Sequence, residues 1–461
     1  MRLTMKEKAS YGLGAVGKDM VYMLSSGYVL YYFQDLLGVS SIAMGAILMA
    51  ARVFDAFNDP LMGIIVAKTK TRFGKFRPWL MIGTLTNAVI LYLMFSAPLS
   101  LSPGSLVAYA ACIYILWGVT YTMMDIPFWS MIPAFTEGGK ERENLTTLAR
   151  SCAGVGSALI TIITMKAVVT LGGGDEIKGF RLFALLVAVL FVIFITLTCL
   201  TIKEKSTVDM ETTSVGEMFR ALIRNDQAMT VVIGIVLINC SLYITSNLLI
   251  YFFKYDFGGA DWIDQYTLFN TFGGGVQILS MMIFFPLIRK FLSTTKVFYL
   301  SLSLAIAGYA ILLFLMSAGV HTLTVLLIPA FLVFLAFGML TVLTTVFLAN
   351  TVDYGQLKNG RRDESVIFSM QTFVVKLASG VAAMIAAICL AVFHISSNTD
   401  EGAAAEAAAG SSLLGLRMTM TILPILGMIV AFVIFRRKFI LTEEKVESIN
   451  EELKALEGES K

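Results

Sequence analysis

The sequence predicts an all-α integral membrane protein with twelve transmembrane helices in two six-helix halves. Three observations support this. The 461 residues are 57% hydrophobic but only 15% charged, with a mean hydropathy of +0.79, whereas soluble domains carry about 25% charged residues. Apolar runs of the ~20 residues that a bilayer crossing requires recur along the chain. Lysine and arginine concentrate in alternate connecting loops.

The predicted spans follow the apolar runs in order. They lie at 10–34, 41–66, 79–98, 106–133, 146–171, 181–201, 228–253, 264–288, 297–318, 323–350, 366–393 and 413–435. No cleavage signal follows the basic residues near the start, so we expect the first run to remain as a helix. The longest polar connector separates runs six and seven. It predicts an N-terminal bundle at 1–202, a middle loop at 203–226, a C-terminal bundle at 227–438 and a tail at 439–461.

The basic residues predict the orientation. One set of loops, together with the N-terminal tail and the triplet 436–438, holds most of the lysine and arginine. The opposite loops hold only Lys178, Arg181, Lys254 and Arg417. We therefore expect a protein of the cell membrane with both termini in the cytoplasm. An even number of spans agrees with this orientation. The tail from Glu443 to Lys461 has apolar residues at helical spacing and predicts an amphipathic helix, which could rest on the membrane surface.

Several functional classes lack support in the sequence. Five cysteines lie in apolar runs without metal or redox spacing, and two histidines lie far apart, so we expect no disulfide, metal centre or cofactor. An enzyme would need a nucleophile and base or a metal site. No Walker motif is present to power transport by nucleotide hydrolysis, and nothing indicates nucleic-acid binding.

The second span carries a polar stripe inside a membrane-length apolar run. Arg52, Asp55, Asn58 and Asp59 share one helical face. A charge at membrane depth costs at least ~2.5 kcal/mol, so such side chains normally face a protein interior or a wet cavity. Two neighbouring carboxylates repel unless a proton or a cation lies between them. This stripe predicts a monovalent cation site. The alternative is a structural salt bridge from Arg52 to Asp55 or Asp59.

The first and fourth spans suggest a site for a polar, uncharged ligand. Lys18 and Asp19 lie within the first span, and Tyr121, Asp125 and Trp129 step by four along the fourth. Aromatic rings stack on the C–H faces of sugars, while charged groups bond to sugar hydroxyls. The combination favours a glycoside. Trp129 by itself could equally be an interfacial aromatic residue.

Two further spans add buried charge. Arg150 opens the fifth span, and Thr372 and Lys376 lie one turn apart on the eleventh. A buried lysine needs a carboxylate partner, and Asp55 or Asp59 is the partner we expect for Lys376. The four basic and four acidic groups are expected to line one hydrated chamber. Unrelated structural ion pairs are the alternative. A channel usually assembles rings of like groups, and this asymmetric set forms no such ring.

Six stretches carry a resemblance to a known family. They are SYGLGAVGKDM (10–20), ARVFDAFNDPLMG (51–63), TRFGKFRPWLMIGTL (71–85), YILWGVTYTMMDIPFWS (114–130), VDYG (352–355) and ESVIFSMQTFVVK (364–376). The chain resembles the glycoside–pentoside–hexuronide:cation symporters. The resemblance implies the major facilitator fold, in which the substrate site lies between two halves. It also implies uptake of a galactoside such as melibiose, coupled to Na⁺, Li⁺ or H⁺.

The resemblance also implies roles for individual residues. The family's cation site falls on Asp55, Asn58, Asp59 and Thr122. Its sugar site falls on Lys18, Asp19, Tyr121, Asp125, Trp129, Arg150, Thr372 and Lys376. Its gate charges fall on Arg142, Asp353, Arg362 and Glu364.

The chain departs from the family pattern at two positions. Thr341 stands where a relative has tryptophan, and Asn350 stands at a position that is acidic in relatives. Relatives extend to hexuronides, pentosides and lysolipids, so these remain alternative ligands. We expect a functional monomer surrounded by membrane lipid.

Overall fold

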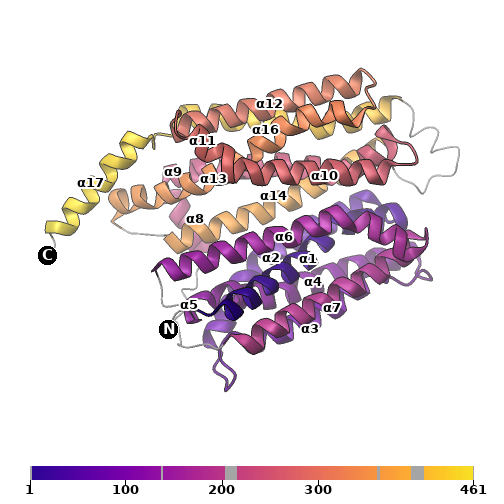
Figure 1. Cartoon of the computed structure of the whole chain (residues 1–461), viewed down its shortest axis with the longest axis horizontal. Coiled ribbons are helices and arrows are strands. Elements are labelled where there is room, and N and C mark those ends of the chain that lie inside the picture. Colours follow the sequence, from indigo (N-terminus) through magenta and orange to yellow (C-terminus); the bar gives the residue numbers. More distant parts are fainter. Residues whose placement is uncertain (1–2, 136–138, 203–214, 361–363, 396–409, 460–461) are drawn as a thin grey trace. The chain divides into compact units, whose positions relative to one another are not determined.

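The computed structural model describes residues 3–135, 139–202, 215–360, 364–395 and 410–459, and the regular structure in these ranges is helical. Clustering of contacts divides the chain into two compact units (Figure 1). Unit 1 comprises the described residues up to 202, and unit 2 comprises those from 215 onward.

Unit 1 contains six long helices and one short one. Its elements are α1 (Met5–Leu30), continued by the π-helical turn η1 (Tyr31–Leu36), α2 (Ser41–Lys68), α3 (Arg77–Met94), α4 (Pro103–Ser130), α5 (Ile132–Phe135), α6 (Gly139–Gly172) and α7 (Glu176–Thr201). The sequence sets several of the starts. Thr4 and Glu7 form a capping box before α1. Pro103 occupies the first turn of α4, after the capping residue Ser102.

Unit 2 contains six long helices, an amphipathic leading helix and a tail helix. Its elements are α8 (Val215–Arg224), α9 (Asp226–Tyr251) with η2 (Phe252–Phe257), α10 (Trp262–Leu279) with η3 (Ser280–Phe284) and α11 (Phe285–Ile288), α12 (Thr294–Ser317), α13 (Leu323–Asn359), α14 (Glu364–Val392), α16 (Gly410–Lys438) and α17 (Glu443–Glu459).

Each of the twelve predicted spans coincides with a helix. Within the described residues, ten helices are long and apolar enough to cross a membrane. The helices at the other two predicted spans, α1 and α3, are not among these ten. The hydropathy of α1 is lowered by Lys18 and Asp19, which lie in the middle of that helix. The predicted middle loop contains α8, a helix that the polar composition did not predict. The boundaries given above for the two bundles, the middle loop and the tail stay a prediction.

Close helix packing in unit 1 fixes the positions of α1 and α4. A Cβ on Gly156 of α6 would collide with the carbonyl group of Val16, so glycine allows α6 to approach α1 closely. A Cβ on Gly83 of α3 would lie 2.7 Å from the backbone nitrogen of Met124 on α4. These two contacts fix the backbone of α1 next to Lys18 and the backbone of α4 next to Asp125.

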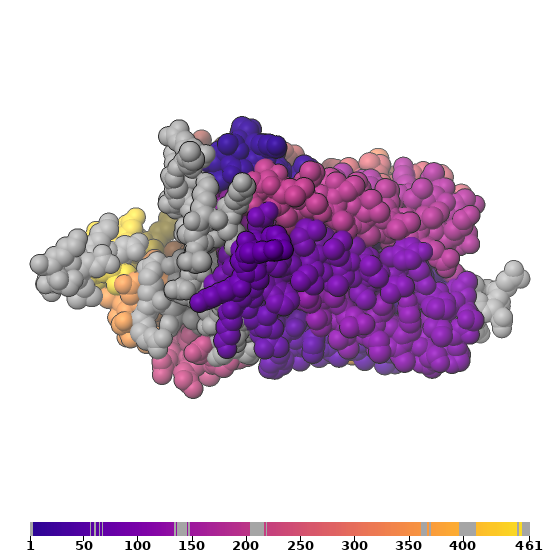
Figure 2. Space-filling view, turned by 90° about the horizontal axis from the view of Figure 1, so that it is seen from below, coloured from indigo at the N-terminus to yellow at the C-terminus, as the bar shows by residue number. Residues whose placement is uncertain are grey.

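The outer surface of unit 1 is apolar, as a bilayer requires. Most of the surface visible in Figure 2 belongs to this unit, coloured indigo to magenta. Exposed apolar side chains recur along α3 and α7, at Leu85, Val89, Leu93, Leu182, Leu186, Val189 and Ile193. A soluble monomer rarely exposes so continuous an apolar surface.

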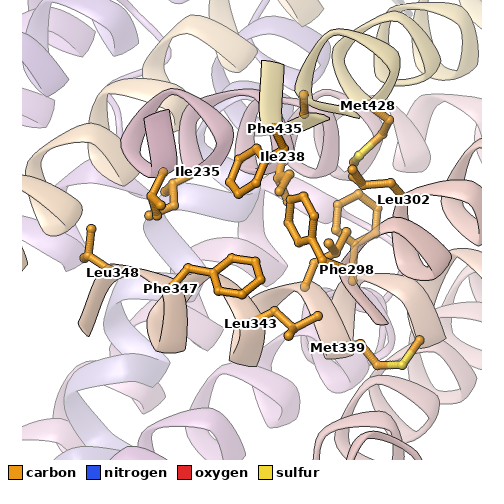
Figure 3. Close-up of a cluster of buried hydrophobic side chains, with 14 of the residues drawn as sticks. Ile235, Ile238, Phe298, Leu302, Met339, Leu343, Phe347, Leu348, Met428 and Phe435 are labelled. Atoms are coloured by element: carbon orange, nitrogen blue, oxygen red, sulfur yellow. The ribbon is translucent and has the colours of Figure 1, made fainter. Parts of the chain in front are cut away.

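Unit 2 has its own aromatic core. Phe298, Phe347 and Phe435 meet from three helices, and the rings of Phe298 and Phe435 lie 4.3 Å apart (Figure 3). Aliphatic and methionine side chains such as Leu302 and Met428 fill the space around these rings.

The tail helix α17 is amphipathic, as the spacing predicted, but its apolar face meets protein. It packs against α13, and Ile449 is fully buried. At its start, Glu443 Oε1 accepts hydrogen bonds from the backbone nitrogen and the hydroxyl of Thr294, and lies 2.7 Å from Arg289 Nη2. A helix that only rests on the membrane surface would not bury Ile449 in this way.

Candidate substrate and cation sites

The first polar cluster of unit 1 is centred on Lys18 of α1, which is only 3% exposed. Its Nζ lies 2.8 Å from Asp125 Oδ1 and 3.0 Å from Asp19 Oδ1, and donates to the Tyr121 hydroxyl at 3.2 Å. The structure thus brings together a buried ammonium and carboxylates from two helices. The aspartates keep nearly a fifth of their side-chain surface exposed, so their outer oxygens can accept from a ligand.

Trp129 of α4 joins this cluster. Its Nε1 donates to Asp125 Oδ1 at 3.1 Å, and the guanidinium carbon of Arg150 lies 4.0 Å from its ring centroid. Lys18 Nζ lies 5.1 Å from the same centroid. A ring that contacts two cations and bonds to a carboxylate is not placed as an interfacial anchor. The structure places Tyr121, Asp125 and Trp129 in one cluster along α4, as their spacing of four residues predicted.

The second cluster lies on α2 and α4. Arg52 Nη1 lies 3.2 Å from Asp55 Oδ2, and its Nη2 donates to the Tyr114 hydroxyl at 3.1 Å. Arg52 and Asp55 are each 5% exposed. A Cβ on Gly118 would lie 2.7 Å from Asp55 Oδ1, so only glycine leaves room for this carboxylate. The salt bridge from Arg52 to Asp55, the alternative interpretation of the α2 stripe, is therefore present.

One turn further along α2, oxygen-bearing groups gather. Thr122 of α4 donates to Asp59 Oδ1 at 2.9 Å. The amide nitrogen of Asn58 is buried without a hydrogen-bond partner in the described residues. Such an orphan is unusual, because buried polar groups are nearly always bonded. Carboxylate, amide and hydroxyl oxygens are the donors that hard cations prefer. Within the described residues, no three His, Cys, Asp or Glu side chains form a metal-binding group.

An aromatic ladder connects the two clusters. On α4, the ring of Trp117 stacks between those of Tyr114 and Tyr121, with centroids 5.6 and 5.2 Å apart. Tyr22 of α1 packs against both Trp117 and Tyr121, and the guanidinium carbon of Arg52 lies 5.6 Å from its centroid. A continuous chain of contacts therefore runs from Arg52 through Tyr22 to Tyr121, the ring beside Lys18.

Sequence reasoning missed the first half of this ladder. Trp117 and Tyr114 continue the Tyr121 stripe back by one and two turns, at positions i−4 and i−7. Extending the stripe toward the start of α4 would have found them.

The seven charged side chains of the two clusters do not balance. Lys18, Arg52 and Arg150 supply three positive charges, and Asp19, Asp55, Asp59 and Asp125 supply four negative charges, a formal sum of −1. One bound monovalent cation would make this set neutral.

The remaining predicted residues lie elsewhere. Thr372 is exposed and Lys376 is half-buried on α14, and Asp353 is half-buried on α13, all in unit 2. The expected pairing of Lys376 with Asp55 or Asp59 stays a prediction. Arg362 lies outside the described residues, as do the side chains of Arg142 and Glu364. Thr341 donates to the Phe337 carbonyl within its own helix.

Solved structures identify the fold. The chain superposes on a nucleoside transporter with a TM-score of 0.65 at 14% identity, covering 94% of this chain and 99% of the other. A structure described as concerning substrate recognition in proton-dependent oligopeptide transporters gives 0.66 at 13% identity, covering 94% and 98%. Together with the helix order, these matches define the major facilitator fold, as predicted.

The family follows from the sequence. Residues 10–443 match the model of the MFS/sugar transport protein family, where MFS denotes the major facilitator superfamily, and the chain belongs to that family. It is therefore a multi-pass membrane transporter and not an enzyme. The predicted resemblance to the glycoside–pentoside–hexuronide:cation symporters is confirmed.

Three relatives illustrate the range of the family. The chain is 30% identical to the raffinose carrier protein of Pediococcus pentosaceus, over 96% of this chain and 70% of that protein. It is 26% identical to a lactose permease of Lactobacillus delbrueckii, over 100% and 74%. It is 27% identical to the putative glycoside/cation symporter YagG of Escherichia coli, over 100% and 97%.

Proposed function

We propose that this protein is a secondary active transporter that carries a glycoside into the cell together with a monovalent cation, Na⁺, Li⁺ or H⁺. One observation carries the proposal: in unit 1, a sugar-type cluster at Lys18 and a carboxylate cluster at Asp55 and Asp59 are joined by contacting aromatic rings. The relatives named as a raffinose carrier, a lactose permease and a glycoside/cation symporter support it.

The Lys18 cluster suits a neutral sugar. Trp129 offers an aromatic face for a pyranose ring, and Arg150 lies against it. The exposed edges of Asp19 and Asp125 accept hydrogen bonds from hydroxyls, and charge-assisted bonds are about twice as strong as neutral ones. A hexuronide would bring a carboxylate to a set whose formal charge is already −1. A lysolipid would leave the polar groups unmatched. We therefore favour a galactoside, and melibiose is the first candidate because the matching stretches are most similar to those of the melibiose permease.

The Asp55–Asp59 region suits the coupling cation. In this structure Arg52 faces Asp55, so an entering cation competes with a tethered guanidinium for the same carboxylate. Asp59, Thr122 and Asn58 supply oxygens one turn away. Release of Arg52 would then move the Tyr22 and Trp117 rings and reshape the sugar cluster. Cation and sugar binding are coupled in this way, and the coupling is reciprocal.

The driving force is sufficient without nucleotide hydrolysis. One monovalent cation moving down 100 mV supplies ~2.3 kcal/mol, and a tenfold cation gradient adds ~1.4 kcal/mol. Together they would concentrate a neutral sugar by several hundred-fold at equilibrium.

Several finer points belong to the proposal. Transport would proceed by alternating access. Thr372 and Lys376 would complete the sugar site, and the gate charges would be Arg142, Asp353, Arg362 and Glu364. We also propose a monomer in the cell membrane, with both termini cytoplasmic and lipid as its surroundings.

Transport in membrane vesicles tests the proposal. We expect melibiose counterflow that depends on Na⁺, Li⁺ or pH, and accumulation that collapses with the cation gradient. Asp59→Ser should keep sugar exchange but lose accumulation. Accumulation that survives this substitution would remove Asp59 from the coupling site, and indifference to a panel of galactosides would reject the substrate class.

A further inference from the structure

We propose that unit 2 binds an anionic phospholipid in a pocket between α8, α9 and α16, with the headgroup at Lys438 and an acyl chain along Ile233 and Ile434. The cavity has a volume of about 470 Å³ and is lined by Ile223, Asp226, Met229, Thr230, Ile233, Ile434 and Lys438. It is separate from the transport clusters of unit 1.

The pocket lies where the first turn of α9 meets the last turns of α8 and α16, and hydrogen bonds fix its frame. Gln227 Nε2 donates to the Lys438 carbonyl at 3.1 Å, and Gln227 Oε1 accepts from the Ile440 nitrogen at 3.0 Å. Asn359 Nδ2 donates to the Arg224 carbonyl at 3.3 Å. The C-terminal ends of α16 and α8 are thus tied in place, and the pocket is preformed.

The charge around the pocket favours an anion. Asp226 also lines it, but its carboxylate lies 2.5 Å from Lys358 Nζ and accepts from the Tyr354 hydroxyl and from Gln227. Among the described residues, Lys438 makes no ion pair, so its ammonium remains available to a ligand. The first turn of α9 adds the partial positive charge of a helix N-terminus.

Neighbouring basic residues extend the positive field. Arg436 and Arg437 precede Lys438 in the same turn and are exposed, as are Arg220 and Arg224 on α8. The distribution of basic residues along the chain assigns this end of unit 2 to the cytoplasmic leaflet. Anionic lipids of that leaflet are attracted to such clusters, and basic pockets between transmembrane helices bind their headgroups.

The apolar wall selects a lipid over a free anion. Four of the seven lining side chains are apolar, and Ile223 and Ile233 keep 73% and 37% of their surface exposed. A free phosphate would leave this surface in water. An acyl chain lying along Met229, Ile233 and Ile434 would cover it, at a gain of about 0.8 kcal/mol per buried methylene group. The pocket therefore matches both parts of the lipid, the headgroup at Lys438 and the acyl chain at the apolar wall.

Native mass spectrometry of the full-length protein in neutral detergent tests the proposal. Phosphatidylglycerol and phosphatidylcholine with identical acyl chains are titrated separately. We expect the wild type to retain phosphatidylglycerol at about tenfold lower concentration than phosphatidylcholine. Lys438→Gln should weaken phosphatidylglycerol binding about fivefold, the worth of one lysine near a headgroup, and leave phosphatidylcholine unchanged. Ile434→Trp should fill the acyl part of the pocket and weaken both lipids.

Arg436→Gln is the matched control, since it removes one charge from the same turn outside the pocket lining. It should weaken phosphatidylglycerol binding less than Lys438→Gln does, because Arg436 adds to the field around the pocket but does not line it. A loss equal to that of Lys438→Gln would mean diffuse surface attraction and would overturn the pocket. Equal binding of the two lipids would overturn the headgroup assignment. Full displacement of phosphatidylglycerol by inorganic phosphate would identify a free-anion site. An unchanged melting temperature verifies that each variant is folded.

Discussion

Lys18 and Asp125 form a buried ion pair between α1 and α4, with Nζ and Oδ1 2.8 Å apart and only 4% and 18% of their side chains exposed. Asp19 contacts the same ammonium from α1. Burying one cation with two anions is costly unless the remaining oxygen atoms find donors. Trp129 Nε1 donates to Asp125, the Tyr121 hydroxyl accepts from Lys18, and sugar hydroxyls would supply further donors to the carboxylates. The pair is therefore a structural link between α1 and α4, and we propose it as part of the sugar site.

Asp125→Asn should remove sugar binding while cation binding survives. The amide is nearly isosteric and still accepts from Trp129, but the charge that orients Lys18 and receives sugar hydroxyls is lost. Loss of a charge-assisted bond of ~2–3 kcal/mol predicts at least a 30-fold weaker sugar affinity. Calorimetric titration of the purified variant with melibiose, and separately with NaCl, measures both.

Trp129→Phe is the matched control for that substitution, because it keeps an aromatic ring but removes the Nε1 donor. It should cost less affinity than Asp125→Asn. If sugar affinity is unchanged in Asp125→Asn, the residue does not belong to the binding site and the Lys18 cluster is only structural.

Removing Lys18 alone should destabilise unit 1 more than removing it together with Asp125. Lys18→Gln removes the ammonium that contacts both Asp19 and Asp125, and breaking a buried pair in this way costs about 3–5 kcal/mol. The double variant Lys18→Gln/Asp125→Asn should recover part of that loss. Melting temperatures of the two single variants and the double variant give the coupling free energy. Simple additivity would indicate that the two side chains do not interact.

The sequence was sufficient to predict the long helices and the polar stripes, because both depend on local periodicity. The Tyr121–Asp125–Trp129 stripe follows from steps of four along one helix, and the structure confirms it. The partners of Arg52 could not be predicted in the same way. Whether its guanidinium bonds to Asp55, Asp59 or Tyr114 depends on how α4 packs against α2, and on the room that Gly118 leaves.

The helix α8 and the burial of Ile449 escaped prediction for a related reason. A short segment between two bundles carries little hydropathy signal, although α8 packs against α9 and α14 once these helices are in place. The amphipathic face of α17 was visible in the sequence, but periodicity does not tell whether protein or membrane covers such a face.

Arg52→Gln should make the fold depend on the coupling cation. Without the guanidinium, buried Asp55 loses the counter-charge that Arg52 supplies on α2, so unit 1 should lose stability in sodium-free buffer, by an amount approaching the ~3–5 kcal/mol of a broken buried pair. A bound Na⁺ takes over that role and should restore part of the loss. Thermal unfolding in choline chloride and in sodium chloride measures the difference. An equal loss in both salts would mean that Arg52 does not compete with the cation.

Asn58→Ala should leave the empty protein about as stable as the wild type but weaken cation binding. The Asn58 amide nitrogen is already buried without a partner, so deleting it removes an unsatisfied group, and the change should stay within about 1 kcal/mol. Loss of an oxygen ligand to a charge predicts roughly tenfold weaker Na⁺ affinity. Asn87→Ala is the contrast, because Asn87 donates to the Trp117 carbonyl and the Thr120 hydroxyl. That variant should destabilise the protein without an ion-specific effect. If Asn58→Ala instead destabilises the protein and leaves Na⁺ affinity unchanged, Asn58 has a purely structural role.

Docking of the tail helix should weaken in acid. The Thr294 backbone N–H bonded to Glu443 is the main reason that the pKa of this carboxyl lies below the ordinary value of 4.5, and the Thr294 hydroxyl and Arg289 lower it further. A carboxyl with a lowered pKa stabilises the docked state above its undocked pKa, and this stabilisation is lost as the pH falls through the docked pKa. The loss should therefore begin near pH 4.5 and grow below it. Because Glu443 is 42% exposed, solvent screening keeps the effect below about 1 kcal/mol.

Hydrogen exchange of α17 measures this effect directly. In the wild type, the amides from Glu443 to Ile449 should lose protection between pH 6 and pH 4, after correction for the intrinsic exchange rate. Glu443→Gln keeps a carbonyl oxygen for the Thr294 N–H but has no charge to titrate, so its protection should be lower at pH 6 and should not change further at pH 4. Glu444→Gln removes the neighbouring carboxylate, which caps nothing, and should behave as the wild type does. Protection that falls equally with pH in all three proteins would show that the burial of Ile449, and not the Glu443 carboxylate, controls docking.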